Sequence, residues 1–208
     1  QTLRKNILGK EITGIDIYYD KMIHGVNPEE FRAKLIGKKI KEIYRLGKYL
    51  YFELADDLYL ISHLRMEGKY YLKDINLPKE KHEHIIFRLD ENLSLRYDDT
   101  RKFGVMELKN QNDLLTTHPL SDLGPEAYQL NADYLSLKLN KRVPIKTLLL
   151  DQNNIAGIGN IYADEICFAC KIHPEMKAKY ISKEIAEYIE MGSSPRGTIA
   201  IMNTAKAI

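Results

Sequence analysis

The sequence predicts an α+β protein of two small domains, with an antiparallel β-sandwich first and a helical domain second. Over the first hundred residues, apolar and polar side chains alternate as in strands, in segments separated by short polar turns. From about residue 112 the apolar residues recur with the 3.6-residue period of helices. Strands followed by helices segregate into separate layers, so we expect a crevice between the two halves.

Five stretches carry the strand pattern of the first half. Tight polar turns between consecutive strands favour antiparallel pairing. The five stretches read EITGIDIYYDKMI, KKIKEIYRLGKYLYFEL, LYLISHLRMEGKYYLKD, HEHIIFRL and LSLRYDD. Two short helices are expected among them, TLRKNIL at the start and PEEFRAKL after Asn27, where Pro28 takes the first helical position.

The second half contains three stronger helix signals. NADYLSLKL begins at an Asn131 cap, PIKTLLLDQ starts with Pro144, and NIYADEICFACKI runs from Asn160. The Pro- and Gly-rich stretch HPLSDLGPEAY is typical of a linker. We therefore expect a sandwich domain at residues 1–112, a helical domain at 113–185 and a helical tail at 186–208 that looks unrelated.

Composition places few limits on function. The 208 residues include 31 Lys and Arg against 29 Asp and Glu, so bulk charge makes no case for a polyanionic partner. No apolar run is long enough to span a bilayer and QTLRKNILGK does not resemble a signal peptide, so a cytosolic protein is expected. Cys167 and Cys170 make at most half of a zinc site, and small helix-face residues are the favoured interpretation.

A glycine turn at residues 157–159 precedes the helix that begins near Asn160. It follows a helical pattern and lacks a third glycine, which excludes a dinucleotide fingerprint. The backbone N–H groups at a helix start favour an anion, and the Asn160 amide could cap the helix or reach a ligand. Taken alone, this pattern favours a plain helical hairpin with an Asn cap over an anion site.

Two loops at strand ends, HLRMEGKYYL and DDTRKFG, combine cations with apolar side chains. Proteins that kink a duplex bind phosphates through cations and insert an apolar side chain between base pairs. Met66, Arg101 and Phe103 could open a DNA stack in this way. The alternative, which the spacing alone favours, is that Met66 and Phe103 are core residues and that Arg101 pairs with Asp98 or Asp99.

Three further side chains near strand ends have open roles. Lys48 follows a glycine, and burial near other cations would lower its pKa enough for proton exchange. His82 and His84 lie on one face of a strand, where they could bind metal, contact phosphate or cap an edge. No third ligand is apparent, which disfavours a metal.

Eight short segments, in order, resemble the formamidopyrimidine-DNA glycosylase family, the Fpg/Nei repair enzymes, over about residues 1–180. The segments are RLGKYLYFEL, SHLRMEGKYYL, EKHEHIIF, LRYDDTRKFG, LGPE, PIKTLLLDQ, GIGNIYADE and KIHPE. The resemblance implies an N-terminal β-sandwich and a helix-two-turns-helix domain with DNA bound across the cleft.

The implied function is excision of oxidised purines such as 8-oxoguanine and formamidopyrimidines, followed by AP lyase cleavage of the abasic strand. The damaged nucleotide is flipped out of the duplex. The implied partner is double-stranded DNA containing an oxidised purine or an abasic site. A monomer is expected, without membrane attachment, in the bacterial cytoplasm at the nucleoid.

The resemblance also assigns roles to individual residues. Met66 and Phe103 match residues that fill the gap left by the flipped nucleotide, and Arg101 matches the residue that pairs with the orphaned cytosine. Lys48 matches the lysine that contacts phosphate and donates a proton in β-elimination. Lys146 matches a lysine close to the damaged base. Three further residues match DNA-contacting positions, namely His82, Lys141 and Asn160.

The two ends depart from the family pattern. The N-terminal proline nucleophile and its neighbouring glutamate are absent from the sequence as given, and so is the four-cysteine zinc finger, so no metal or cofactor is expected. The tail resembles a piece of MoxR-type AAA+ ATPases, with Arg196 in a nucleotide-sensing position but no Walker A motif. A catalytically inactive module that binds damaged or abasic DNA, and a truncated or chimeric reading frame, therefore remain open.

Overall fold

The computed structural model describes residues 2–181, which form two units that divide after Thr117. The predicted tail and Arg196 lie outside the described residues. None of the helices within residues 2–181 combines the length and the apolar character that crossing a membrane requires.

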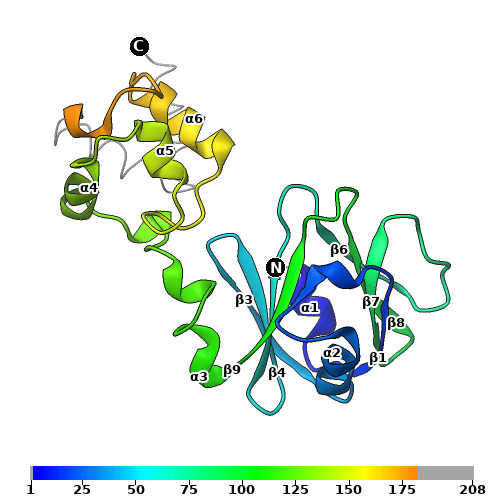
Figure 1. The fold of residues 1–208 in the computed structure, drawn as a ribbon. Helices are drawn as coiled ribbons and strands as arrows, with labels where there is room; N and C mark the ends of the chain where they lie inside the picture. The colour runs from blue at the N-terminus through cyan, green and yellow to red at the C-terminus, as the bar shows by residue number, and fades with distance from the viewer. Residues whose placement is uncertain (1, 182–208) are drawn as a thin grey trace. The chain divides into compact units, whose positions relative to one another are not determined.

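The first unit is a two-sheet sandwich, as the alternating pattern predicted (Figure 1). One sheet has four strands in the order β1-β7-β8-β6, and the other has five in the order β2-β9-β5-β4-β3. The strands are β1 (Ile12–Ile17), β2 (Ile23–His24), β3 (Ile40–Leu46), β4 (Tyr49–Leu54), β5 (Leu58–His63), β6 (Lys69–Asp74), β7 (Glu83–Leu89), β8 (Leu93–Asp98) and β9 (Val105–Asn110). All pairings are antiparallel except that of β2 with β9, which is parallel.

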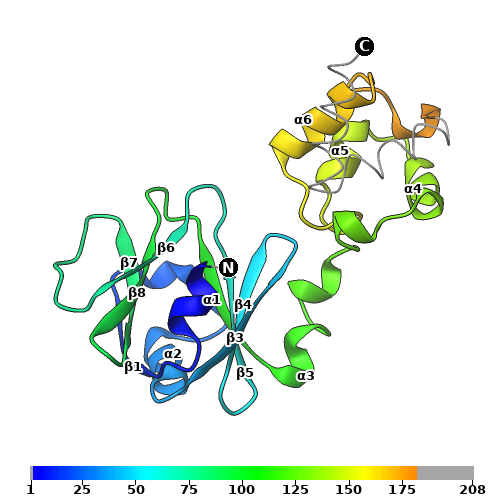
Figure 2. The ribbon, with the colours of Figure 1, turned by 180° about the vertical axis from the view of Figure 1, so that it is seen from behind.

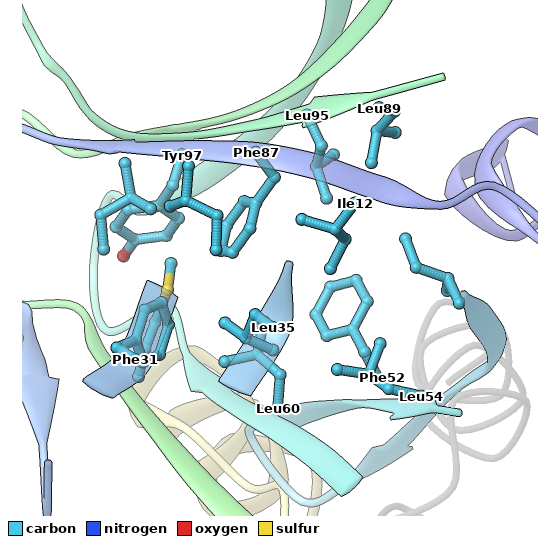
Figure 3. Packing of buried hydrophobic residues seen from close by; sticks show 14 of the residues in the cluster. Ile12, Phe31, Leu35, Phe52, Leu54, Leu60, Phe87, Leu89, Leu95 and Tyr97 are labelled. Atoms are coloured by element: carbon cyan, nitrogen blue, oxygen red, sulfur yellow. The ribbon is translucent and has the colours of Figure 1, made fainter. Parts of the chain in front are cut away.

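The core of this unit lies between the two sheets (Figure 3). Phe87 and Leu95 from the four-stranded sheet face Phe52 and Leu60 from the other, and all four are at most 3% exposed. Helices α1 (Thr2–Ile7) and α2 (Pro28–Leu35) add Ile7, Phe31 and Leu35 to the same cluster. Both helices were predicted, and Asn27 caps α2 by accepting a hydrogen bond from the Glu30 backbone N–H at 2.8 Å.

The second unit is helical (Figure 2). It has an apolar core of its own. Two short elements that precede it in the chain, the 3₁₀ turn η1 (Asp20–Met22) and the helix α3 (Gln111–Leu114), still belong to the first unit. The second unit contains 3₁₀ turns η2 (Leu120–Asp122), η3 (Ala127–Gln129) and η4 (Ala178–Tyr180), and helices α4 (Ala132–Leu139), α5 (Ile145–Leu150) and α6 (Asn160–Ala169).

The helix starts of the second unit differ in detail from expectation. Asn131 caps α4 as predicted, accepting from the Tyr134 backbone N–H at 2.8 Å. Pro144 precedes α5 instead of opening it. Cys167 is packed in the core and Cys170 lies at its edge, consistent with small helix-face residues, and burial raises the pKa of both thiols.

Candidate nucleic-acid interface

The β5–β6 loop (64–68) and the β8–β9 loop (99–104) bring Met66, Arg101 and Phe103 into one exposed cluster. Arg101 donates from Nη1 to Met66 Sδ at 3.0 Å, and its guanidinium carbon lies 4.6 Å from the centre of the Phe103 ring. Met66 is 73% exposed and Phe103 51% exposed, so the alternative that they are core residues is wrong. We call these three side chains the wedge cluster.

Asp99 holds the β8–β9 loop in shape from beneath. Its carboxylate is fully buried and accepts hydrogen bonds from the backbone N–H groups of Arg101, Phe103 and Gly104, at 3.0, 2.9 and 2.8 Å. The sequence left open an ion pair between Arg101 and Asp98 or Asp99. Asp99 instead binds the Arg101 backbone, which leaves the guanidinium to contact Met66 and Phe103.

A buried tyrosine, Tyr97, lies under both loops. A Cβ atom added at Gly68 would lie 2.2 Å from the Tyr97 hydroxyl oxygen, and one added at Gly104 would lie 1.7 Å from it. Both positions therefore require glycine, because the loops pack directly on the phenol. Burial raises the pKa of Tyr97, so the phenol stays neutral, and its hydroxyl points to the Asp99 carboxylate at 3.5 Å.

Lys48 and His63 form a second group of polar side chains in this unit. Lys48 lies in the β3–β4 turn, and burial lowers the pKa of its ammonium group. His63 packs edge-on against Tyr49, with 4.6 Å between ring centres. Burial, together with the charges of Arg65 and Lys48, lowers the pKa of His63 to about 4. At neutral pH His63 is therefore uncharged, and Lys48 is the cation of this pair.

The two histidines of the KHEH stretch have different environments. His84 is 4% exposed, and its Nε2 lies 2.9 Å from the Asp99 carbonyl oxygen, so it supports the β8–β9 loop from inside. His82 precedes strand β7, and its carbonyl accepts a hydrogen bond from the Asp99 N–H at 3.0 Å. Their common strand face was predicted, but only the side chain of His82 stays outside the buried network.

In the second unit, Gln152 braces the glycine turn before α6. Its amide donates to the carbonyls of Leu150 and Ile158 at 2.8 and 2.9 Å, and its oxygen accepts from the Gly157 N–H at 3.0 Å. Gly157 has a φ of 96°, which favours glycine. Gly159 occupies the N-cap position, and Asn160 is the first helical residue and is exposed. The capping alternative for the Asn160 amide is therefore wrong.

The two predicted lysines of this unit have partners. Lys141 donates to Asn154 Oδ1 at 3.0 Å, and Lys146 forms an ion pair with Asp164 at 2.6 Å. Asn154 is itself 4% exposed and donates to Asp151, so Lys141 is fixed next to the turn that follows α5. Lys146 is on α5 and Asp164 on α6, so their ion pair links the two helices.

Sequence reasoning did not identify His63, Tyr97, Asp99 or Gln152 as functional. The sequence signal for Asp99 and Tyr97 was weak, because an aspartate before a turn and an aromatic residue in a strand occur in many β-proteins. Gln152 was quoted only as the end of a helix. Their support of the loops depends on contacts that a single sequence does not display.

Two family models match the chain. The model of the formamidopyrimidine-DNA glycosylase N-terminal domain matches residues 1–106, and that of the H2TH domain of the same enzymes matches residues 123–194. The second match extends past residue 186, where the unrelated-looking tail was predicted to begin.

Bacterial relatives and solved structures are similar over most of the chain. Formamidopyrimidine-DNA glycosylase of Bacillus licheniformis is 45% identical over 88% of this chain and 68% of its own length, and that of Listeria innocua is 42% identical over 100% and 75%. The Lactococcus lactis enzyme bound non-covalently to DNA containing an AP site superposes with a TM-score of 0.88 at 36% identity, covering 99% of this chain and 78% of that one. The G226P mutant of the same enzyme in complex with Fapy-dG-containing DNA gives the same TM-score and identity, and the match covers 99% of this chain and 74% of that one.

Proposed function

Because the chain belongs to the formamidopyrimidine-DNA glycosylase family, we propose that it repairs DNA by base excision, removing oxidised purines such as 8-oxoguanine and formamidopyrimidines and then cutting the abasic strand. The observation that carries this proposal is the wedge cluster, in which two apolar side chains and a guanidinium stand exposed on adjoining loops. A protein that acts on a base inside a duplex must first extrude it, and the vacated space has to be filled.

In this proposal Met66 and Phe103 enter the gap, and Arg101 binds the base left without a partner. Unstacking a base step opposes extrusion by about a few kcal/mol. Met66 and Phe103 are exposed in the free protein and become buried between the bases. Their removal from water is favourable and offsets the cost of unstacking. Arg101 presents planar donors suited to the edge of an orphaned cytosine.

Lys48 serves as the proton donor of the elimination steps. The desolvated ammonium group holds its proton less tightly than a lysine in water, which favours transfer to a leaving group. His63 is neutral at the pH of the reaction, and its Nδ1 accepts a hydrogen bond from the Arg65 backbone N–H at 3.0 Å. The proton of the neutral ring is therefore on Nε2, from which His63 donates a hydrogen bond to phosphate.

The helical unit and the KHEH stretch supply further contacts to DNA. Asn160 and the start of α6 bind a phosphate, in line with the preference of helix N-termini for anions. Lys141, Lys146 and His82 contact the DNA as the family pattern implies. We further propose that one copy of the chain acts as a monomer at the bacterial chromosome.

Borohydride trapping on a duplex with one 8-oxoguanine tests the reaction, because it converts a Schiff base between protein and C1′ into a stable adduct. A covalent adduct and strand cleavage are expected from a protein that carries the family's N-terminal proline, which is not among residues 1–208, and the 208-residue chain by itself should leave no adduct. Equilibrium binding to an abasic-site duplex is measured in parallel, and Arg101→Ala should weaken it selectively. Selective binding without an adduct even from the proline-bearing protein would reduce the proposal to damage recognition, and equal affinity for damaged and intact duplexes would refute it.

A further inference from the structure

The first unit contains an open pocket of about 440 Å³ beside the wedge cluster. Its wall is basic. The residues that bear on the inference are Lys21, His24, Arg65, Lys102, Phe103 and Gly104. A site for a neutral small molecule is lined mainly by apolar and aromatic groups, whereas this pocket has four basic side chains beside Phe103 and Val105.

Three separate segments of the chain build this pocket. Lys21 comes from η1 and His24 from the short strand β2, which pairs in parallel with the beginning of β9 through Ile23 and Met106. Arg65 and Lys102 come from the two loops of the wedge cluster. Both have positive φ angles, 56° and 59°, a strained conformation for residues with side chains. The fold therefore holds two cations in place against a local backbone preference.

The positive charge of the pocket is not neutralised within the part of the chain that the structure describes. There Lys21, Arg65 and Lys102 form no ion pair with a carboxylate, and the Lys102 ammonium lies over the Tyr19 ring, 4.9 Å from its centre. Glu107, which is opposite His24 in the β2–β9 pairing, is bound to Lys109 at 2.7 Å. Gathered cations without counter-charges attract an anion, and the pocket is open enough to admit one from outside.

We propose that this basic pocket binds a backbone phosphodiester of the DNA duplex, next to the base step that the wedge cluster enters; the inference rests on the proposed function. The pocket and the cluster share Phe103, Arg65 precedes Met66, and Lys102 lies between Arg101 and Phe103. A wedge inserted into the stack therefore brings a flanking phosphate to these cations. Contacts to phosphate carry no sequence information but fix the register of a protein on the duplex. The basic pocket sets how far, and at which step, the wedge enters.

The first experiment compares Lys21→Ala and Arg65→Ala with Lys34→Ala, which removes an exposed lysine of α2 that is ion-paired with Glu30. Affinity is measured for two duplexes, one intact and one with a tetrahydrofuran abasic-site analogue, over a range of salt concentrations. Each pocket variant should bind both duplexes about two- to fivefold more weakly at low salt. The slope of log K against log salt should become shallower by about 0.9 for each lost phosphate contact. The control should bind like the wild type.

The second experiment places single uncharged methylphosphonates at each phosphate flanking the abasic site, one strand at a time. One position should weaken wild-type binding and have no effect on the Lys21→Ala, Arg65→Ala double variant, and the strand that carries it identifies the phosphate. If no position behaves in this way, or if the pocket variants keep the wild-type salt slope, the basic pocket is overturned. In that case the proposed function still stands if the wild type prefers the abasic duplex. Conversely, the proposed function alone is refuted if the wild type shows no such preference while the pocket variants have a shallower salt slope.

Discussion

Replacing Asp99 by asparagine should detach the wedge cluster from its support while changing almost no volume. The carboxylate accepts three backbone hydrogen bonds, from Arg101 at one oxygen and from Phe103 and Gly104 at the other. An asparagine has one side-chain oxygen, so it can accept hydrogen bonds at only one of the two carboxylate oxygen positions. At the other position its NH₂ group faces a backbone N–H, and two donors cannot bond to each other. If the oxygen keeps Phe103 and Gly104, two charge-assisted bonds become neutral ones, each weaker by about 1 kcal/mol, and the Arg101 N–H loses its acceptor at about 1–2 kcal/mol.

These contributions add up to a destabilisation of about 3–4 kcal/mol, which is an upper value because the loop can shift to reach water. Urea unfolding followed by far-UV circular dichroism measures it, fitted with a separate transition for each unit. Asp98→Asn is the matched control, since no loop N–H binds that neighbouring carboxylate. Binding to abasic and intact duplexes gives the functional readout. An Asp99→Asn protein that unfolds within about 0.5 kcal/mol of the wild type and still prefers abasic DNA would refute this account of the loop.

Three other changes have defined outcomes. Met66→Ala should reduce affinity for an abasic duplex about tenfold, or ~1.4 kcal/mol, with little effect on intact DNA in the same titration. His63 is neutral in the folded protein down to about pH 4 but takes up a proton near pH 6.5 when unfolded, so stability should fall as the pH drops through that interval. Partial exposure limits the effect to about 1–2 kcal/mol, and His63→Gln should flatten the unfolding free energy against pH. Gln152→Met removes three hydrogen bonds at the glycine turn and should destabilise the helical unit by about 2–3 kcal/mol in urea; a variant as stable as the wild type would show that the turn does not need this brace.

The elements that sequence reasoning predicted well are those whose signals are local. Asn27 with Pro28 and Asn131 cap their helices through their own side chains, so the pattern and the contact lie within a few residues. The alternation of β-strands likewise reflects one buried face for each strand. The spacing alone favoured burial of Met66 and Phe103, because large apolar side chains are usually inside, and only the fold places them at the surface.

The features that sequence reasoning missed depend on long-range pairing. The parallel contact of β2 with β9 joins residues 23 and 106, and no turn signal marks it. The basic pocket needs this contact, because Lys21 and His24 meet Lys102 only once β2 lies beside β9. For the same reason a net charge of +2 concealed the local charge, since the four basic residues are spread over more than eighty positions of the sequence.

The support beneath the wedge cluster indicates how a pair of loops can act on a stiff duplex. A flexible loop would lose conformational freedom on entering the stack, and that entropy loss would weaken binding. Here the loop backbone is fixed before DNA arrives, by a fully buried carboxylate on one side and a neutral buried phenol that both Gly68 and Gly104 contact. The side chains of Met66, Arg101 and Phe103 remain exposed, and Arg101 already lies against the other two. Insertion then requires the DNA to deform while the protein stays nearly unchanged, so a damaged or abasic step, which resists unstacking least, is the step that the wedge enters.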